Sequence, residues 1–292
     1  MKIQVLITKK SSAYELIDSG GGRKLERYGD VVFSRPDPQA LWSIEKPESI
    51  WKKAQAVFIR KGKHTEWNIK ETVPKKWPLE FLGLTFSIRP TSFKHLGLFP
   101  EQSQNWIWIE EKIEQQVAKN KQVNVLNLFG YTGGATLVSL RAGASVTHVD
   151  SSKVAVMWAK ENAELSNLRE KPVRFITDDA ILFLKREIKR GNKYDAIIMD
   201  PPAFGHGPSG ELWKIEEQFT ELIELCKKVL TRDPIFFLVS GYASLYSPMT
   251  YANSLATITK DFSGTIEFGE LALQESDTER LLPAGIFARW SK

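Results

Sequence analysis

The sequence has little cysteine, no histidine cluster and no long apolar run. One cysteine, Cys226, occurs in 292 residues, which excludes a disulfide framework and a cysteine-based zinc site. The four histidines lack the spacing of metal ligands, so no metal is expected. Without a run of about 18 apolar residues, no transmembrane helix is expected. The first ten residues also lack a signal peptide's apolar stretch. These absences favour a cytoplasmic protein that has no membrane partner.

Two nucleotide-binding fingerprints are missing as well. A dinucleotide-binding fold uses G-x-G-x-x-G, whose spacing seats a pyrophosphate on a helix N-terminus. Here Gly130, Gly133 and Gly134 are spaced G-x-x-G-G. No Gly-Lys-Ser/Thr follows them, which excludes a P-loop. The sequence therefore argues against both pyrophosphate-binding arrangements.

What the sequence does contain is a strand, a glycine turn, a helix and a second strand. Residues 123–129 are an apolar run too short for a helix, and residues 135–142 are predicted to be helical. The next strand, 146–149, ends at Asp150, which lies 20 positions after Gly130. The glycines let a backbone approach a ligand, and the carboxylate can accept hydrogen bonds from ribose hydroxyls. We predict a nucleoside site here; an α/β turn without a ligand is the alternative.

Positive charge is concentrated in the first third of the chain. Residues 1–85 hold 16 Lys and Arg against 10 Asp and Glu, whereas the remainder holds 24 against 25. The length predicts two domains, and we expect a small basic β-rich domain over 1–85 and a larger domain over 86–292. A basic domain suits a polyanion such as RNA, although an ordinary solvated surface is equally compatible.

Four tryptophans of this basic segment lie among lysines. Such rings either stack on bases or form the core of a small β-rich domain, and the core is the favoured interpretation. The four are Trp42, Trp51, Trp67 and Trp77.

Acidic side chains follow the third predicted strand, 173–176. Ligands of a doubly wound sheet bind at the carboxyl ends of its strands, where Asp150 also lies. Adjacent carboxylates repel each other unless a ligand or a donor uses one of them. Asp179 is our preferred acceptor for an adenine amino group, ahead of Asp178.

The fourth predicted strand, 194–199, runs into Asp200, Pro201 and Pro202. The prolines fix the turn and leave backbone carbonyls to accept hydrogen bonds from a flipped base, on which Phe204 would stack.

Two β segments end the chain, at 264–273 and 284–290. Paired as an antiparallel edge, they complete a seven-stranded sheet. The predicted fold class is therefore α/β, a Rossmann-like sheet with a small β-rich domain before it. This ending distinguishes a methyltransferase from a dehydrogenase.

Together these motifs resemble the bacterial class I methyltransferase family that includes large-subunit ribosomal RNA methyltransferases with a small N-terminal domain. The matching segments, in order, are YELIDSGGGRKLERYGD, FKHLGLFPEQ, LNLFGYTGGATL, HVD, DDA and DPPAFGHGPSGELW. The resemblance implies S-adenosyl-L-methionine as cofactor and RNA, in particular ribosomal RNA, as partner. The implied cofactor-binding residues are Phe93, Lys94, Phe99, Gln102, Phe129, Gly130, Tyr131, Thr132, Gly133, Asp150, Ser151, Asp178, Asp179, Ala180 and Asp200.

One departure from the family bears on the chemistry. Relatives that methylate carbon 5 of a pyrimidine need a cysteine nucleophile after the fourth or fifth strand, where this chain has Ala203 and Ser240. Cys226 falls in a predicted helix and is interpreted as a packing residue. We therefore favour transfer to a base nitrogen, which mainly requires positioning. The predicted catalytic residues are Asp200, Pro201, Pro202 and Phe204. A non-catalytic RNA-binding module, or the same chemistry on a protein or small molecule, remains open.

Overall fold

The computed structural model describes residues 3–61, 64–92, 94–208, 210–242 and 246–292. The chain forms two compact units. The catalytic unit, as we name it, comprises Met1–Leu6, Gln104–Glu270 and Gly285–Lys292, and the β-rich unit comprises Ile7–Ser103 and Leu271–Ala284. The boundary expected between residues 85 and 86 falls inside a strand of the β-rich unit, which pairs with the strand before it.

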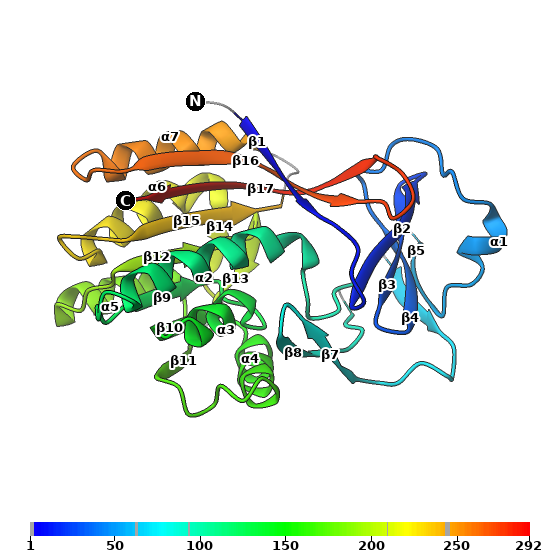
Figure 1. The fold of residues 1–292 in the computed structure, drawn as a ribbon, viewed down its shortest axis with the longest axis horizontal. Coiled ribbons are helices and arrows are strands. Elements are labelled where there is room, and N and C mark those ends of the chain that lie inside the picture. The colour runs from blue at the N-terminus through cyan, green and yellow to red at the C-terminus, as the bar shows by residue number, and fades with distance from the viewer. Residues whose placement is uncertain (1–2, 62–63, 93, 209, 243–245) are drawn as a thin grey trace. The chain divides into compact units, whose positions relative to one another are not determined.

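The catalytic unit is built on an eight-stranded sheet (Figure 1). Its strands are β1 (Ile3–Thr8), β9 (Asn124–Leu128), β10 (Ser145–Asp150), β11 (Val173–Thr177), β12 (Ala196–Met199), β15 (Phe236–Gly241), β16 (Thr265–Gln274) and β17 (Leu281–Ser291). They lie in the order β1-β16-β17-β15-β12-β9-β10-β11. The five strands from β15 to β11 are parallel, and β17 runs antiparallel to β15. The carboxyl ends of the parallel strands therefore share one edge of the sheet.

Six helices accompany this sheet. They are α2 (Ser103–Val117), α3 (Gly134–Arg141), α4 (Lys153–Leu165), α5 (Ala180–Arg190), α6 (Ile215–Val229) and α7 (Pro248–Thr259). Alternate strand residues face opposite layers. Phe237 joins the buried core formed with α5, α6 and α7, whereas its neighbour Phe236 packs edge-on against Trp108 of α2, at 5.1 Å between ring centroids. The sheet is thus covered on both faces, as its continuous apolar strands require.

The seven expected strands are confirmed, and β1 adds an eighth. Residues 2–8 alternate weakly, which is compatible with a strand but does not indicate its partner. In the structure β1 pairs with β16, where a Cβ atom on Gly269 would meet the carbonyl oxygen of Gln4 at 1.8 Å. Only a glycine lets the first strand approach this edge.

The β-rich unit holds a five-stranded sheet in the order β2-β3-β4-β5-β6 and a separate hairpin, β7–β8. The bounds are β2 (Tyr14–Gly20), β3 (Arg23–Tyr28), β4 (Val31–Pro36), α1 (Glu48–Trp51), β5 (Ala56–Lys61), β6 (His64–Ile69), β7 (Trp77–Phe81), β8 (Leu84–Ile88) and the 3-10 helix η1 (Pro100–Gln102). A small β-rich domain at this end of the chain is therefore confirmed.

The tryptophans of this unit are held by its own residues. Trp51 is buried and donates to Asp18 at 2.8 Å. Trp77 stacks on Phe33, and Trp67 meets the same ring edge-on. Trp42 donates to a backbone carbonyl at 2.9 Å. The structure thus agrees with the favoured interpretation that these rings form the domain's own core.

A buried ion pair lies inside the β-rich unit. The Arg35 side chain donates to Glu26 with Nε to Oε1 at 2.7 Å, and Tyr14 donates to the other carboxylate oxygen at 3.1 Å. Burial disfavours the charged carboxylate, but the neighbouring guanidinium of Arg35 lowers the pKa of Glu26 below its usual value. The pair is therefore ionised, and each partner compensates the other's loss of water.

We expect Glu26→Gln to lower the free energy of unfolding by about 3–5 kcal/mol, because it leaves the Arg35 charge buried without a counter-charge. Denaturant unfolding measures this loss. A matched control is Glu48→Gln, which removes an exposed pair with Arg23 and should cost less than about 1 kcal/mol. Equal losses in the two variants would contradict the assignment.

Candidate functional site

The loop after β9 has an uncommon backbone. Phe129 and Tyr131 adopt left-handed conformations with φ of 54° and 47°, and Gly133 has φ of 91°. A left-handed conformation is costly for residues with a Cβ atom and persists only where the surroundings enforce it. Such loops are typical of ligand sites, so the loop is a strong candidate on its backbone alone.

The glycines of this loop are required by packing inside the protein. A Cβ atom on Gly130 would lie 2.5 Å from the His148 ring, and one on Gly134 would lie 2.1 Å from the Trp106 ring. The sequence argument explained these glycines by the close approach of a ligand. The structure gives a different reason for these two, which is the close approach of side chains from β10 and α2.

Beneath the loop lies a polar chain of three side chains. Asn127 donates to the Thr136 hydroxyl, which in turn lies 2.9 Å from Nδ1 of His148. Burial lowers the pKa of His148 to about 3, so the imidazole is neutral. The Thr136 hydroxyl thus joins the Asn127 amide to the imidazole, and the tautomer of His148 sets which atom donates in the second bond. Sequence reasoning assigned no role to these residues, which fix the floor of the loop.

The carboxylate of Asp150 ties the loop to the end of β10. One of its oxygens accepts from the backbone N–H of Tyr131 at 2.9 Å, and the other accepts from the N–H of Ser152 at 2.8 Å. Burial raises the pKa of Asp150, and these two N–H groups act in the opposite direction. Each oxygen keeps a second lone pair for a ligand hydroxyl.

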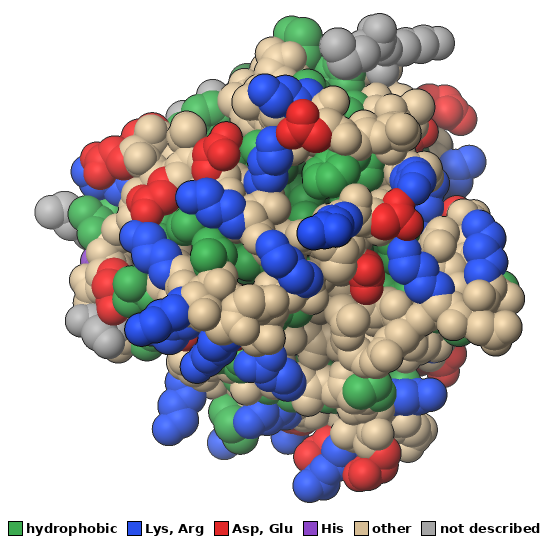
Figure 2. Space-filling model, turned by 90° about the vertical axis from the view of Figure 1, so that its left-hand side faces the viewer, with side chains coloured by type: hydrophobic (Ala, Val, Ile, Leu, Met, Phe, Trp, Pro, Cys, Tyr) green, Lys and Arg blue, Asp and Glu red, His purple; other side chains and the backbone are tan. Residues whose placement is uncertain are grey.

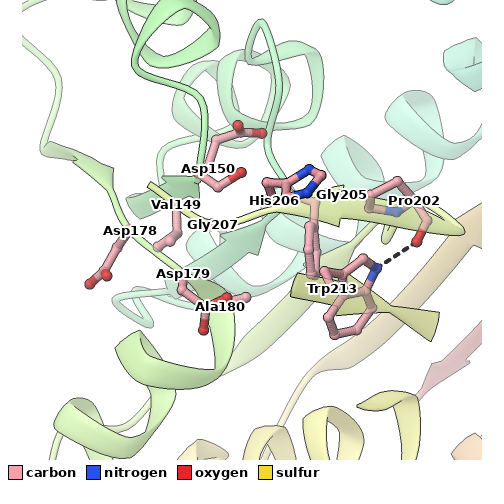
Figure 3. A pocket seen from close by; sticks show the side chains of 12 residues that line it. Val149, Asp150, Asp178, Asp179, Ala180, Pro202, Gly205, His206, Gly207 and Trp213 are labelled. Carbon is pink, nitrogen blue, oxygen red and sulfur yellow. Dashed lines mark hydrogen bonds between the residues drawn. The ribbon is translucent and has the colours of Figure 1, made fainter. Parts of the chain in front are cut away.

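A narrow cleft opens beside Asp150 at the carboxyl ends of the strands (Figure 3). Its enclosed volume is about 30 Å³, an order of magnitude below the usual range for ligand pockets. The lining residues are Phe129, Val149, Asp150, Ser151, Asp178, Asp179, Ala180, Pro202, Gly205, His206, Gly207 and Trp213. Seven of the predicted site residues thus meet at one cleft, brought there from four segments of the chain.

Other predicted residues lie outside this lining set. Within the described chain, the cleft is not lined by Gly130, Tyr131, Thr132, Gly133, Asp200, Pro201 or Phe204. Thr132 is buried, and its carbonyl accepts a hydrogen bond from Asn162 at 2.8 Å. Thr132 is therefore held by α4 and does not face the cleft.

The two adjacent acids after β11 have different partners. Asp178 forms an ion pair with Arg186, and its carboxylate points away from His206 and Trp213 in Figure 3. Asp179 caps α5 by accepting from the N–H of Leu182 at 2.9 Å. Each carboxylate therefore has a donor within the protein, which relieves the repulsion expected from the sequence.

The carbonyls of the double-proline turn are less available than expected. The Pro202 carbonyl accepts from Nε1 of Trp213 at 2.6 Å (Figure 3). The Ala203 carbonyl accepts from the N–H of Ile215 at 3.1 Å. These two carbonyls therefore each accept a hydrogen bond from within the protein. The segment that follows the turn folds back and uses them.

That segment is a hairpin which sequence reasoning missed. Its strands are β13 (Phe204–His206) and β14 (Leu212–Lys214), and it contributes His206 and Trp213 to the cleft. Both strands have only three residues, too few to show an alternating pattern. The glycines on both sides of a Pro-Ser pair were the available signal for a tight turn. Phe204 is 56% exposed and meets His206 edge-on.

Asp200 directly follows β12 and does not line the cleft. Burial raises the pKa of Asp200 to about 6, and a hydrogen bond with Ser240 of β15 partly counteracts this. Cys226 is fully buried in the core between α6 and the sheet, and burial raises the pKa of its thiol. Its interpretation as a packing residue is confirmed.

The remaining predicted residues belong to the β-rich unit, which is described separately. There Lys94 has φ of 64°, and its carbonyl accepts from Arg35 at 2.8 Å. Phe99 contacts the ring of His95 at 5.3 Å, and Gln102 ends η1. Phe93 lies outside the described residues.

Two searches of the described chain found nothing to add. Along these ranges, no helix combines the length and apolar character needed to cross a membrane. In the same ranges, no group of three His, Cys, Asp or Glu side chains is arranged to hold a metal ion.

The parallel sheet with an antiparallel end, the loop after β9 and the acid at the end of β10 define a Rossmann-like methyltransferase fold. Residues 104–225 match the family described as Conserved hypothetical protein 95. A SAM-dependent methyltransferase from Agrobacterium tumefaciens with a known crystal structure is 38% identical in sequence to this chain, and the two structures superpose with a TM-score of 0.93. The match covers 99% of this chain and 93% of that one. The chain belongs to the family of S-adenosylmethionine-dependent methyltransferases.

A more distant solved structure agrees in fold, and a curated protein is similar in sequence. A structure described as a SAM-dependent methyltransferase from Streptococcus mutans matches with a TM-score of 0.71 and 16% identity, covering 96% of this chain and 76% of that one. Ribosomal RNA large subunit methyltransferase K/L from Pseudoalteromonas atlantica is 31% identical over 203 residues, which is 69% of this chain and 25% of that protein. The chain thus spans about a quarter of the length of the curated relatives it matches.

We expect Asp200→Asn to make stability less dependent on pH. A carboxyl whose pKa is raised by folding contributes its full stability below the pKa of the unfolded chain, about 4, and loses it as pH rises through about 6. The free energy of unfolding of the variant, minus that of the wild type, should therefore be about 2 kcal/mol higher at pH 8 than at pH 3.5. Urea unfolding at both pH values measures this. A difference that does not change with pH would contradict the raised pKa.

Proposed function

We propose that this protein methylates RNA, in particular large-subunit ribosomal RNA, and that its cleft at the carboxyl ends of β9 to β12 holds the adenosine part of S-adenosylmethionine. The observation that carries the proposal is the position of Asp150, whose carboxylate lines the cleft with a lone pair left on each oxygen. The residues present fit a nucleoside: an acceptor for ribose hydroxyls, apolar walls from Phe129 and Trp213, and acids at the far side.

Each cleft residue has a proposed role. Asp150 accepts from the ribose hydroxyls, and Phe129 and Ala180 form the walls against which a base lies. Asp179 is the proposed acceptor for the adenine amino group, because Asp178 is paired with Arg186. When bound, S-adenosylmethionine supplies a methyl group activated by its sulfonium. The chain's own task is to orient the acceptor toward that group and to keep water away.

Binding of a nucleoside requires the cleft to open. The enclosed volume of about 30 Å³ is too small for adenosine, and three residues of the β13–β14 region, Gly205, His206 and Gly207, line one side. The hairpin is held there through the bond between Trp213 and Pro202. We infer that this hairpin shifts outward to admit the cofactor, since the opposite walls are strand ends within the sheet.

The acceptor would be placed by the segment after β12. Asp200 has a pKa of about 6 and is therefore largely ionised at neutral pH, where it can accept a proton from an amino or ring N–H group. Phe204 is exposed enough to stack on a base. The buried position of Cys226 supports a nitrogen acceptor over pyrimidine carbon 5, which requires an accessible thiolate.

Ribosomal RNA as substrate is supported by the similarity to the K/L methyltransferases, which bear that name, and by the basic segment at residues 1–85. With that substrate the activity would take place in the cytoplasm. A protein or small molecule as substrate would leave the excess of cations in that segment without a ligand.

We expect Asp150→Asn to weaken the binding of S-adenosylhomocysteine by about 10-fold or more, because an amide is a poorer acceptor than a carboxylate for hydroxyls and for the two backbone N–H groups. Isothermal titration calorimetry measures the affinity. Thr177→Ala, at the exposed end of the adjacent strand, is the matched control and should bind as wild type does. Absence of any binding heat with the wild type would overturn the proposed cofactor site.

The substrate is tested by mass spectrometry of ribosomal RNA nucleosides from cells lacking the protein. We expect one methylated nucleoside to be missing, to return with the wild-type gene and to stay missing with Asp200→Ala, because the acceptor is no longer oriented. The variant should still bind S-adenosylhomocysteine. An unchanged nucleoside profile would direct the search to a protein or small-molecule substrate.

A further inference from the structure

The edge of the catalytic sheet opposite the cofactor cleft is rich in basic side chains. The parallel strands begin on the left in Figure 1, next to the C-terminus, and Figure 2 views this side of the molecule. Lys and Arg side chains gather on this face, with fewer Asp and Glu among them. The reaction proposed above takes place at the other ends of the same strands, so it gives this charge no role.

The charge is segregated along the sequence. Residues 86–292 carry 24 Lys and Arg against 25 Asp and Glu, so this part of the chain is nearly neutral. Yet the segments 171–174, at the start of β11, and 189–193, before β12, together hold five cations and no acid, and are bordered by the exposed Glu170 and the buried Asp195. A unit that is neutral overall but has a cationic face creates a positive electrostatic potential at that face, and such a potential attracts polyanions.

A cleft lies between these two segments, at the amino ends of β9 to β12. Its volume is about 460 Å³, within the usual range for ligand sites. The lining residues are Asn124, Ser145, Val146, Thr147, Pro172, Val173, Arg174, Asn192, Lys193 and Tyr194. Its charged members, Arg174 and Lys193, are both cations, and amide and hydroxyl groups supply further hydrogen-bond donors.

The cations beside this cleft are ordered by one buried carboxylate. Glu187 is fully buried and accepts from Tyr194 at 2.7 Å, from Asn192 at 2.8 Å and from Arg190 at 2.9 Å. Burial works against its charge, but these hydrogen bonds lower the pKa of Glu187, so it remains ionised. Arg174 approaches it to 3.8 Å.

The two guanidinium groups are thereby oriented, yet both remain accessible to a further anion. The side chains of Arg174 and Arg190 are still 54% and 56% exposed. Lys193 is exposed too, and its ammonium donates one hydrogen bond, to the carbonyl of Lys228 at 2.6 Å. Groups that are held in place but open to solvent lose little entropy when they bind an anion.

We propose that this amino-end cleft binds backbone phosphates of the RNA substrate, with Arg174 and Lys193 as the principal contacts. The inference rests on the proposed function, since it takes RNA as the substrate. The five residues of β9 separate the two edges of the sheet by about 16 Å. RNA that reaches this cleft must therefore extend beyond the nucleotide that is methylated, so the site favours a large folded RNA over a short strand.

RNA is preferred to a free nucleotide because the positive charge continues beyond the cleft. Lys171 and Lys189 flank it within the same two segments, and Lys228 and Arg232 follow at the ends of α6 and its loop; all four are exposed. A single phosphate uses one or two cations, whereas a row of them matches the repeated charge of a nucleic acid backbone.

The test is a charge reversal, Arg174→Glu with Lys193→Glu, measured by binding to large-subunit ribosomal RNA fragments at several salt concentrations. We expect affinity at low salt to fall about fivefold or more, and the slope of log K against log salt to decrease in magnitude by about 1.5, since two phosphate contacts are lost. Binding of S-adenosylhomocysteine should not change. The neutral pair Arg174→Gln with Lys193→Gln should give the same slope if the reversed variant folds poorly beside Glu187.

The matched control reverses two exposed lysines outside the cleft, Lys160→Glu with Lys260→Glu, and should keep most of the affinity and slope. If the wild type binds the RNA and the cleft variants bind it equally well, this inference is wrong while the proposed function stands. If the wild type binds no RNA at any salt concentration, the proposed function itself fails. If inorganic phosphate binds the wild type and only that binding is lost in the variants, the cleft is a small-anion site and the inference is overturned.

Discussion

The structure of the cofactor cleft depends on the carboxylate of Asp150. Both of its oxygens accept backbone N–H groups, one from Tyr131 in the loop after β9 and one from Ser152 before α4. The loop would otherwise carry the cost of left-handed residues on both sides of Gly130 without compensation. Two charge-assisted hydrogen bonds offset that cost and fix the loop against β10. The same residue therefore shapes the cleft and offers its remaining lone pairs to a ligand.

The glycines of the loop show that a sequence motif can record packing as well as binding. Gly130 lies against the neutral His148, and Gly134 lies against Trp106. Both contacts bring neighbouring elements closer to the loop than a Cβ atom allows. The glycine-rich turn after β9 thus reflects how tightly α2 and β10 pack around the loop.

Most of the catalytic fold could be predicted because its elements have clear periodicity. The apolar run 123–129 and the helical segment 135–142 correspond to β9 and α3, and the two terminal strands are neighbours as expected, although β1 lies outside them at the edge. The partner of β1 could not be predicted, because its pairing with β16 joins distant parts of the chain. The β13–β14 hairpin was missed because its three-residue strands are too short for any pattern. Because the hairpin was not predicted, the hydrogen bond from Trp213 to the Pro202 carbonyl could not be predicted either.

The narrow cleft has a consequence for how tightly any nucleoside is held. The cleft holds about 30 Å³, and the β13–β14 hairpin on one side of it is fastened by Trp213, so a nucleoside would enter by the outward shift of the hairpin proposed above. A measured dissociation constant then combines two equilibria, the opening of the hairpin and the intrinsic association with the open form. If only a small fraction of molecules is open, the observed affinity is weakened by that fraction. Anything that stabilises the open hairpin, including a substrate resting on Phe204, would tighten cofactor binding without touching the cofactor.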